Sequence, residues 1–351
     1  MPRNRVISAA EALFVSTSPA TGSQTGIYQL HRVQSCTQSW NINRQNVSQF
    51  GSLAPVSREI NEAPTVTLDF SYLLTNVLNE QRLGLVVDGS ISTISNLLNK
   101  TQDEKNYYLT QSAEGTDAVG DASSRGVIGI GNGFLSSYST EAAVNGFPTS
   151  TVRVEGLNIA SYLSSSGQTT PAVNPVDGSR LNFLFNIPTA ASGLAGQPAV
   201  LKHGDITMNL TSPQVGVDIN DAKIQRYTLS FNLAREPLQK LGSKFAFSKE
   251  LTFPIAVTLS VDANQGDLTS GSLSDILCND VSYNLSIVLK QPACTGSGPT
   301  AVRFDLKNAK LDSQNFNSTI GPSKSVTMTW TSNLGSFNDT VDGVFISGSL
   351  V

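Results

Sequence analysis

The chain contains one stretch of sequence twice, and this duplication limits the available folds more than any other feature. Residues 33–71 align without a gap with residues 224–262, a separation of 191 positions. Twelve aligned positions are identical, and apolar residues such as Trp40 and Phe231 coincide as well. A repeat at a fixed separation is typical of an architecture built from one repeated structural unit. We therefore expect two copies of one unit.

The rest of each copy follows in the same order, with shorter matches. Residues 107–156 align with 283–332 at a separation of 176, which matches Leu109 with Leu285 and Asn132 with Asn308. The sequence Val-Asp-Gly occurs at 176–178 and again at 341–343. These matches predict an N-terminal arm (1–10), a first unit (11–188), a linker (189–203) and a second unit (204–351).

Local patterns favour strands in both copies. In residues 65–72, Val66, Leu68 and Phe70 alternate with polar residues, which is the pattern of a half-buried strand. One helix per copy is expected, at 90–99 and near 273–277, behind serines suited to capping. The predicted fold is mainly β: two tandem antiparallel β-sandwich or barrel units, each with one packed helix.

Bulk composition excludes several classes of protein. The 351 residues suit about two domains, and no apolar run is long enough to cross a bilayer. The start lacks the apolar core of a signal peptide, and three cysteines that are not repeated between copies do not make a disulfide framework. We therefore expect a protein made in a cytosol, without membrane partners. A net charge of −4 argues against a protein that grips nucleic-acid phosphates.

No residue pattern indicates catalysis, and we expect no cofactor and no metal. The two histidines, His31 and His203, have no catalytic partner at a suitable spacing; we interpret His31 as a surface residue. The glycine-rich segment 129–133 is interpreted as a turn or bulge rather than a phosphate loop, because the third glycine of a dinucleotide site is missing. Residues 262–267 begin like a calcium loop, but glycine falls at the fifth position and the twelfth residue is Leu273.

Two charged pairs are kept identically by the duplication: Arg44 with Glu59, and Arg235 with Glu250. Each pair flanks a turn, around Gly51 or Gly242. One interpretation is a surface salt bridge across a hairpin, which contributes little stability. The other is a recurring contact between adjacent units of a ring, so these four residues are our candidate ring-interface residues.

The residues at 1–7, 30–41, 49–51 and 64–76 resemble the major tail tube protein of tailed bacteriophages. That resemblance implies a β-sandwich unit with a flanking helix, whose long hairpins join side by side into the inner wall of a ring. It further implies stacked rings in the virion tail, of six subunits or of three duplicated ones, with DNA passing through the lumen without specific binding. The partners implied are the chain itself, a tail tip or baseplate, a terminator and, in a contractile tail, a sheath.

The alternative hypothesis is a soluble two-domain β module of a phage particle: a decoration, baseplate or host-attachment protein. Exposed aromatic residues in loops, such as Tyr107, Tyr108, Phe134 and Tyr138, would then form a binding surface. Self-association distinguishes the two hypotheses.

Overall fold

The structure is a computed structural model. It describes residues 11–17, 26–112, 117–118, 126–163, 170–181, 187–188, 199–210, 216–217, 223–265, 268–269, 281–293, 298–318 and 323–350. The expected N-terminal arm (1–10) and most of the expected linker (189–198) lie outside these ranges. Within these ranges the fold is mainly β, as the sequence predicts, with antiparallel strand pairing and two short α-helices.

In its described residues, the first copy contains ten strands and two helices. They are β1 (Glu11–Thr17), β2 (Ile27–Gln29), β3 (Val33–Asn41), β4 (Arg44–Val47), β5 (Ser57–Ile60), β6 (Thr65–Leu73), α1 (Leu78–Arg82), α2 (Ser95–Leu98), β7 (Glu104–Gln111), β8 (Gly126–Ala143), β9 (Thr149–Gly156) and β10 (Asn158–Leu163).

Over its described residues, the second copy repeats most of this strand order. Its elements are the 3-10 turn η2 (His203–Asp205), β11 (Ile206–Leu210), β12 (Gly216–Val217), β13 (Lys223–Asn232), β14 (Arg235–Leu238), β15 (Ser248–Leu251), β16 (Ile255–Asn264), β17 (Leu268–Thr269), β18 (Tyr283–Lys290), β19 (Thr300–Asn317), β20 (Ser325–Leu334) and β21 (Gly343–Gly348).

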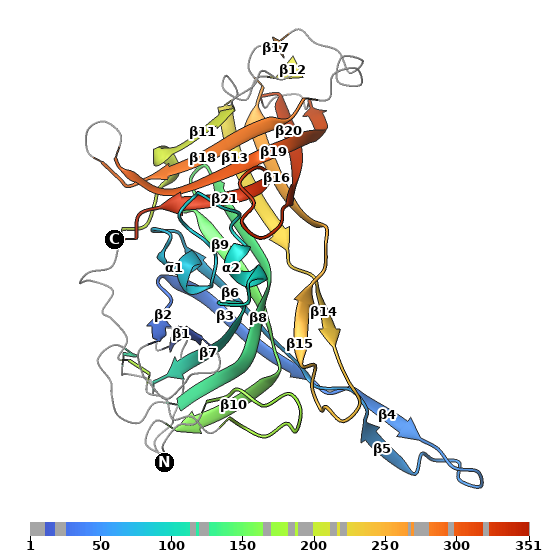
Figure 1. Ribbon diagram of the computed structural model, residues 1–351. Coiled ribbons are helices and arrows are strands. Elements are labelled where there is room, and N and C mark those ends of the chain that lie inside the picture. The colour runs from blue at the N-terminus through green and yellow to red at the C-terminus, as the bar shows by residue number, and fades with distance from the viewer. Residues whose placement is uncertain are drawn as a thin grey trace.

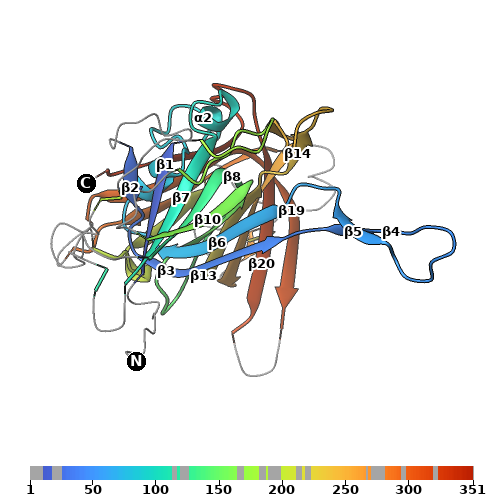
Figure 2. The same ribbon diagram turned by 90° about the horizontal axis from the view of Figure 1, so that it is seen from below.

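One sheet runs through both copies. Its neighbours are β3, β6, β9 and β8 from the first copy, followed by β13, β16, β20 and β19 from the second. The strands β8 and β19 are 18 residues long in each copy, and their first halves continue into a second layer. There β8 pairs with β7 and β10, and β19 pairs with β18 and β21. Each copy is therefore a sandwich whose two layers share one long strand (Figures 1 and 2).

Backbone irregularities repeat at the same separations as the sequence. The register of β3 with β6 shifts between Val33 and Ser35, and that of β13 with β16 between Ile224 and Arg226. The residues Asn132 and Asn308 both have positive φ, 52° and 51°. A β-bulge is a specific local feature, so its recurrence at matching positions extends the duplication from sequence to structure.

One detail of the predicted alignment is wrong. Leu109 lies opposite Ile128 in the first copy, whereas the equivalent Phe304 lies opposite Ile287. Leu109 therefore corresponds to Ile287 rather than to Leu285. A shift of two residues keeps every side chain on the same face of the sheet, so the apolar pattern alone could not detect it.

The predicted helix at 90–99 is also shorter than expected. Only α2 (Ser95–Leu98) is helical, and it has no side-chain cap. Ser90 instead bonds to the Asp88 carboxylate through both its N–H and its hydroxyl, a local turn that competes with helix formation. The helix α1 was not anticipated, and the helix expected near 273–277 lies outside the described residues.

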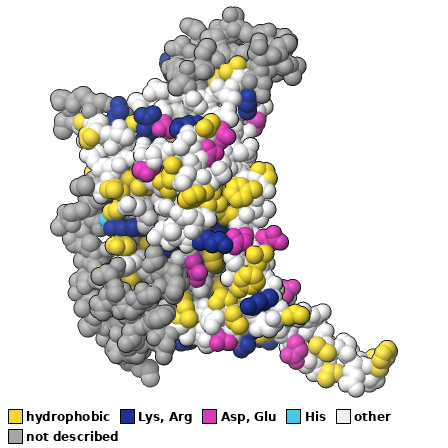
Figure 3. Space-filling view, in the orientation of Figure 1, with side chains coloured by type: hydrophobic (Ala, Val, Ile, Leu, Met, Phe, Trp, Pro, Cys, Tyr) yellow, Lys and Arg dark blue, Asp and Glu magenta, His cyan; other side chains and the backbone are white. Residues whose placement is uncertain are grey.

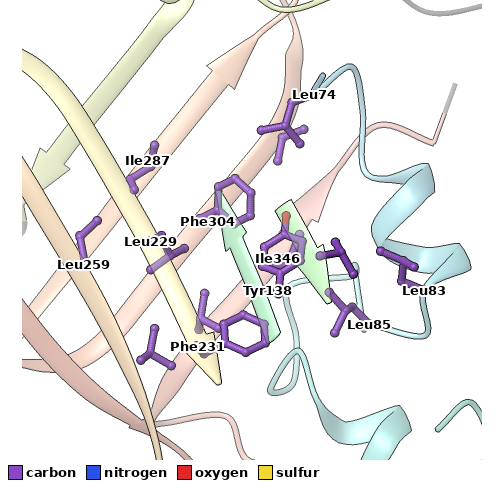
Figure 4. Packing of buried hydrophobic residues seen from close by; sticks show 14 of the residues in the cluster. Leu74, Leu83, Leu85, Tyr138, Leu229, Phe231, Leu259, Ile287, Phe304 and Ile346 are labelled. Atoms are coloured by element: carbon purple, nitrogen blue, oxygen red, sulfur yellow. The ribbon is translucent and has the colours of Figure 1, made fainter. Parts of the chain in front are cut away.

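The two copies share one hydrophobic core. A continuous cluster of buried side chains extends from Leu83 and Leu85 in the first copy to Leu259 and Ile287 in the second (Figure 4). At its centre, the rings of Tyr138 and Phe231 stack 5.4 Å apart. The copies are therefore halves of one packed body, although each is long enough to form its own core.

Each copy also carries a two-stranded extension of its central hairpin. We call β4–β5 the first outer hairpin and β14–β15 the second outer hairpin. The first extends well beyond the body of the molecule, and the second lies closer to it (Figure 1). The turn glycines Gly51 and Gly242 have matching φ values of 87° and 86°.

Candidate functional site

The strands β8 and β13 form the junction between the copies, which we call the internal joint. Seven residue pairs align across it, from Arg226 opposite Ala143 to Asn232 opposite Ser137. Backbone hydrogen bonds extend the joint at both ends, from the Leu233 N–H to the Ser136 carbonyl (2.8 Å) and from the Val144 N–H to the Gln225 carbonyl (2.9 Å).

The two ends of the central sheet repeat the two sides of this joint. At one end, β3 is the copy of β13 and pairs only with β6 among the described strands. At the other end, residues 313–317 of β19 are the copy of residues 137–141 of β8 and pair only with β20 in the described part of the chain. We call these two segments the outer edges. The β3 edge is equivalent to the β13 side of the joint, and the β19 edge is equivalent to the β8 side.

Burial differs sharply between the joint and the β3 edge. The side chain of Phe231 in β13 is 2% exposed, whereas its counterpart in β3, Trp40, is 60% exposed. Both side chains lie on the core face of the sheet, because Trp40 is opposite Val66 and Phe231 is opposite Val257. Large exposed apolar groups mark interaction surfaces when they gather in patches. Trp40 therefore occupies a position that its counterpart shows to be suited to burial.

The second outer hairpin is anchored by Arg235. Its guanidinium donates to both carboxylate oxygens of Asp103 (3.0 and 2.6 Å), to the Leu135 carbonyl (3.0 Å) and to the Lys249 carbonyl. The side chains of Arg235 and Asp103 are 2% and 11% exposed. A bidentate, desolvated pair of this kind has both strength and fixed geometry.

The ion pair of Glu250 is also with the first copy rather than across its own hairpin. Its carboxylate lies 2.5 Å from the Lys100 ammonium, and hydrogen bonds from Lys100 and Ser248 lower the pKa of Glu250. In the strand register Arg235 faces Leu251, and Glu250 faces Glu236. The simple interpretation, a salt bridge between Arg235 and Glu250 across their hairpin, is therefore wrong for the second copy.

The counterparts in the first outer hairpin are exposed. Arg44 lies opposite Ile60, and Glu59 lies opposite Gln45. Neither has an ion pair among the described residues. The hairpin tip carries Phe50 and Leu53, both fully exposed, and Figure 3 shows hydrophobic side chains at this tip. The structure thus places Arg235 and Glu250 at a contact between copies and leaves Arg44 and Glu59 on an extension with no contact of that kind.

The face of the central sheet opposite the core is polar and rich in hydroxyl groups. Hydroxyl pairs join neighbouring strands, Ser35 with Ser71 (2.6 Å) and Ser39 with Thr67 (2.7 Å). Serines and threonines continue across β9, β8, β13, β16 and β20. Its charged side chains have both signs and include Asp69, Glu141, Arg153, Glu155, Arg226 and Asp262. We call this surface the hydroxyl face.

A buried carboxylate supports the internal joint from the core side. Glu80 of α1 is fully buried and accepts hydrogen bonds from the hydroxyls of Tyr72 (2.7 Å) and Tyr138 (3.0 Å). Burial raises the pKa of Glu80 above its ordinary value of 4.5. Since Tyr138 also stacks on Phe231, Glu80 helps to position an aromatic pair at the joint. No sequence pattern indicates this cluster.

The structure also tests the interpretations of segment 129–133 and of His31. The interpretation of segment 129–133 as a bulge is confirmed, because β8 is irregular there opposite Lys105 and Tyr107. His31 lies just before β3, as expected, but it is half-buried rather than freely exposed. Its backbone bonds to the Asn79 side chain, its ring lies 3.0 Å from Arg82, and burial lowers its pKa to about 4.

Asp262, the first residue of the calcium-like segment, lies on β16 and accepts a hydrogen bond from Thr327; residues 266–267 lie outside the described ranges. Among the residues that the structure describes, no three His, Cys, Asp or Glu side chains gather in a way that could hold a metal. Within the same residues, no helix has both the length and the apolar character needed to span a bilayer.

No protein-family model matches this chain, and no curated protein resembles it significantly. The interpretation therefore depends on the geometry of the internal joint and the outer edges.

Proposed function

We propose that this protein is a structural subunit that self-assembles into rings, which stack into the tail tube of a bacteriophage. The observation that carries the proposal is that the two outer edges are equivalent, by the duplication, to the two sides of the internal joint. Because of this equivalence, the β3 edge of one chain can pair with the β19 edge of a second chain in the same way that β13 pairs with β8. Head-to-tail contacts of this kind close into a ring when the rotation permits.

Pairing between subunits also removes two exposed strand edges. An unpaired edge is a site for association with another chain, and antiparallel addition of a strand satisfies its backbone groups. With two copies in each chain, three subunits make a ring of six repeats, and six subunits make a ring of twelve. The internal joint specifies how two subunits pair, and the rotation at which the ring closes sets the number of subunits.

The hydroxyl face suits the wall of a DNA channel. The second layer of each sandwich and the helices cover the opposite face of the central sheet, so the hydroxyl face is the one left to line a lumen. Tight binding of DNA requires clusters of Lys and Arg against phosphates, and the charges on this face have both signs. DNA would therefore pass without being held. The partners beyond the chain itself would be a tail tip or baseplate, a terminator and, in a contractile tail, a sheath, all in the virion.

The internal joint predicts the register between subunits. Transferred to the outer edges, the pairing of Thr228 with Glu141 puts Thr37 of one subunit opposite Asn317 of the next. Directly opposite Cβ atoms lie about 4.5–5.5 Å apart, close to the separation that a disulfide needs. The double variant Thr37→Cys/Asn317→Cys should therefore form covalent oligomers on mild oxidation.

The test combines electron microscopy of concentrated protein with denaturing gel electrophoresis of the oxidised variant. We expect rings or striated tubes, and a ladder of covalent species that stops at the ring number, three or six. The matched control Thr37→Cys/Ser313→Cys moves one thiol about 13 Å along β19 and should not cross-link. A protein that stays monomeric even with a tail-tip complex added would contradict the proposal and favour the alternative, a two-domain binding module of the particle.

A further inference from the structure

The second outer hairpin provides an internal example of how an outer hairpin seats on a neighbouring unit. Arg235 reaches across to the bulge in β8, where the register shifts between Leu135 and Ser137, and donates to the Leu135 carbonyl at 3.0 Å. The backbone of Leu233 donates to Ser136, the bulged residue itself. The bulge in β8 is therefore the docking point of the second outer hairpin.

The same bulge recurs on the second copy. The register of β19 with β20 shifts between Leu311 and Ser313, 176 positions after the shift in β8. The bulged residue here is Asp312 instead of Ser136, and its side chain is exposed. No ion pair to Asp312 is present in the described part of the chain. The second copy thus presents an exposed carboxylate at the docking point where the first copy has a hydroxyl.

The first outer hairpin carries the complementary charge. Arg44 is the counterpart of Arg235, is exposed, and lies on the extension that projects from the body (Figure 1). When β3 pairs with β19 as β13 pairs with β8, the guanidinium of Arg44 meets the Leu311 carbonyl, and Asp312 is the next residue. Opposite charges at such a contact contribute both specificity and rate of association.

We propose that the first outer hairpin of each subunit seats on the β19 bulge of the next subunit, where Arg44 pairs with Asp312 and with the Leu311 carbonyl. This inference depends on the proposed function, because it requires subunits joined at their outer edges. The pair is an ionic contact between two copies of this chain. It selects the correct partner edge, because no other exposed bulge in the described strands combines a free carboxylate with the strand register that β3 needs.

Charge reversal tests the pairing. The single variants Arg44→Glu and Asp312→Arg should each raise the critical concentration for assembly at least about tenfold, because each puts like charges at the joint. The double variant Arg44→Glu/Asp312→Arg restores opposite charges and should assemble close to the wild-type concentration. All three should keep the wild-type circular dichroism spectrum and thermal midpoint, since both side chains are exposed in the single chain.

The control is Arg303→Glu, a charge reversal on the first half of β19, where Arg303 pairs with Asp305 of its own strand (2.8 Å). It should leave the critical concentration unchanged. If the wild-type protein assembles and both single variants assemble normally, the pairing is overturned and the proposed function stays intact. The same holds if the double variant is as defective as the two single variants added together. Failure of the wild-type protein itself to assemble would overturn both.

Discussion

Truncation of Trp40 is the most direct measure of what the β3 edge contributes to assembly. Trp40 is 60% exposed in the single chain, and its counterpart Phe231 is 2% exposed at the internal joint. For a tryptophan with roughly 250 Å² to bury, that difference is roughly 150 Å². At about 25 cal/mol per Å², this burial is worth about 3–4 kcal/mol for each joint between subunits. The variant Trp40→Ala should lose most of this free energy, which raises the critical concentration for assembly roughly a hundredfold.

Sedimentation across a concentration series measures this change, and intrinsic fluorescence provides a second readout. The chain has two tryptophans, and the other, Trp330, is fully buried. Assembly should therefore shift the emission of Trp40 to shorter wavelength while that of Trp330 stays constant. The control Phe337→Ala removes an aromatic side chain that is 51% exposed and belongs to neither outer edge, so its critical concentration should match the wild type.

Assembly of Trp40→Ala at the wild-type concentration would refute the reasoning, because it would mean that Trp40 stays in water when subunits join. An emission maximum that does not move on assembly would lead to the same conclusion. Either result would remove the equivalence between the β3 edge and β13, whatever particles the protein forms.

Three further predictions concern the single chain. Burial raises the folded-state pKa of Glu80, so the contribution of Glu80 to the free energy of unfolding is complete below its unfolded pKa. That contribution is lost as pH rises through the folded-state pKa. Urea denaturation from pH 4.5 upward should show this decline, and the variant Glu80→Gln should flatten it. The pKa of His31 is lowered to about 4, so its contribution to the free energy of unfolding is present above pH 6.5 and is lost as pH falls towards 4. The variant His31→Gln should remove that loss. If its free energy of unfolding falls on acidification as much as that of the wild type, this prediction is contradicted. A Cβ at Gly131 would lie 2.3 Å from the Pro171 carbonyl oxygen, so Gly131→Ala should lower the free energy of unfolding by about 2 kcal/mol or more, whereas Gly146→Ala, with its nearest atom at 3.4 Å, should change it little.

The sequence predicted the central hairpins well because their information is local. Alternating side chains define the two faces of a strand, and the ungapped alignment transfers the pairing of one hairpin to the other. The bulges at Val33 and Ile224 and the turns at Gly51 and Gly242 follow that alignment without adjustment.

The arrangement between the copies could not be predicted, because it depends on contacts between residues far apart in the chain. No pattern in β8 marks it as the partner of β13, and Arg235 bonds to Asp103, 132 positions away. Likewise, α1 has only five residues, too few for a helical period to be visible. The cluster of Glu80 with Tyr72 and Tyr138 requires three segments to meet, and the counterparts of its tyrosines, Ala263 and Gln314, cannot repeat it.

These differences separate two kinds of position in the duplication. Some positions on the core face differ between copies: Tyr72 corresponds to Ala263, and Tyr138 to Gln314. In contrast, the charges of the outer hairpins, Arg44 with Arg235 and Glu59 with Glu250, are identical, although only the second pair makes ionic contacts among the described residues.

Folding of one chain explains why the second pair is kept, since both of its members join the copies. It does not explain the first pair, which is exposed and projects away from the body. A contact made once inside the chain and again between chains explains both, because each outer hairpin then meets an equivalent surface. If Arg44 and Glu59 instead served only solubility, neutral replacement of both would leave assembly unaffected, whereas the repeated contact requires it to weaken.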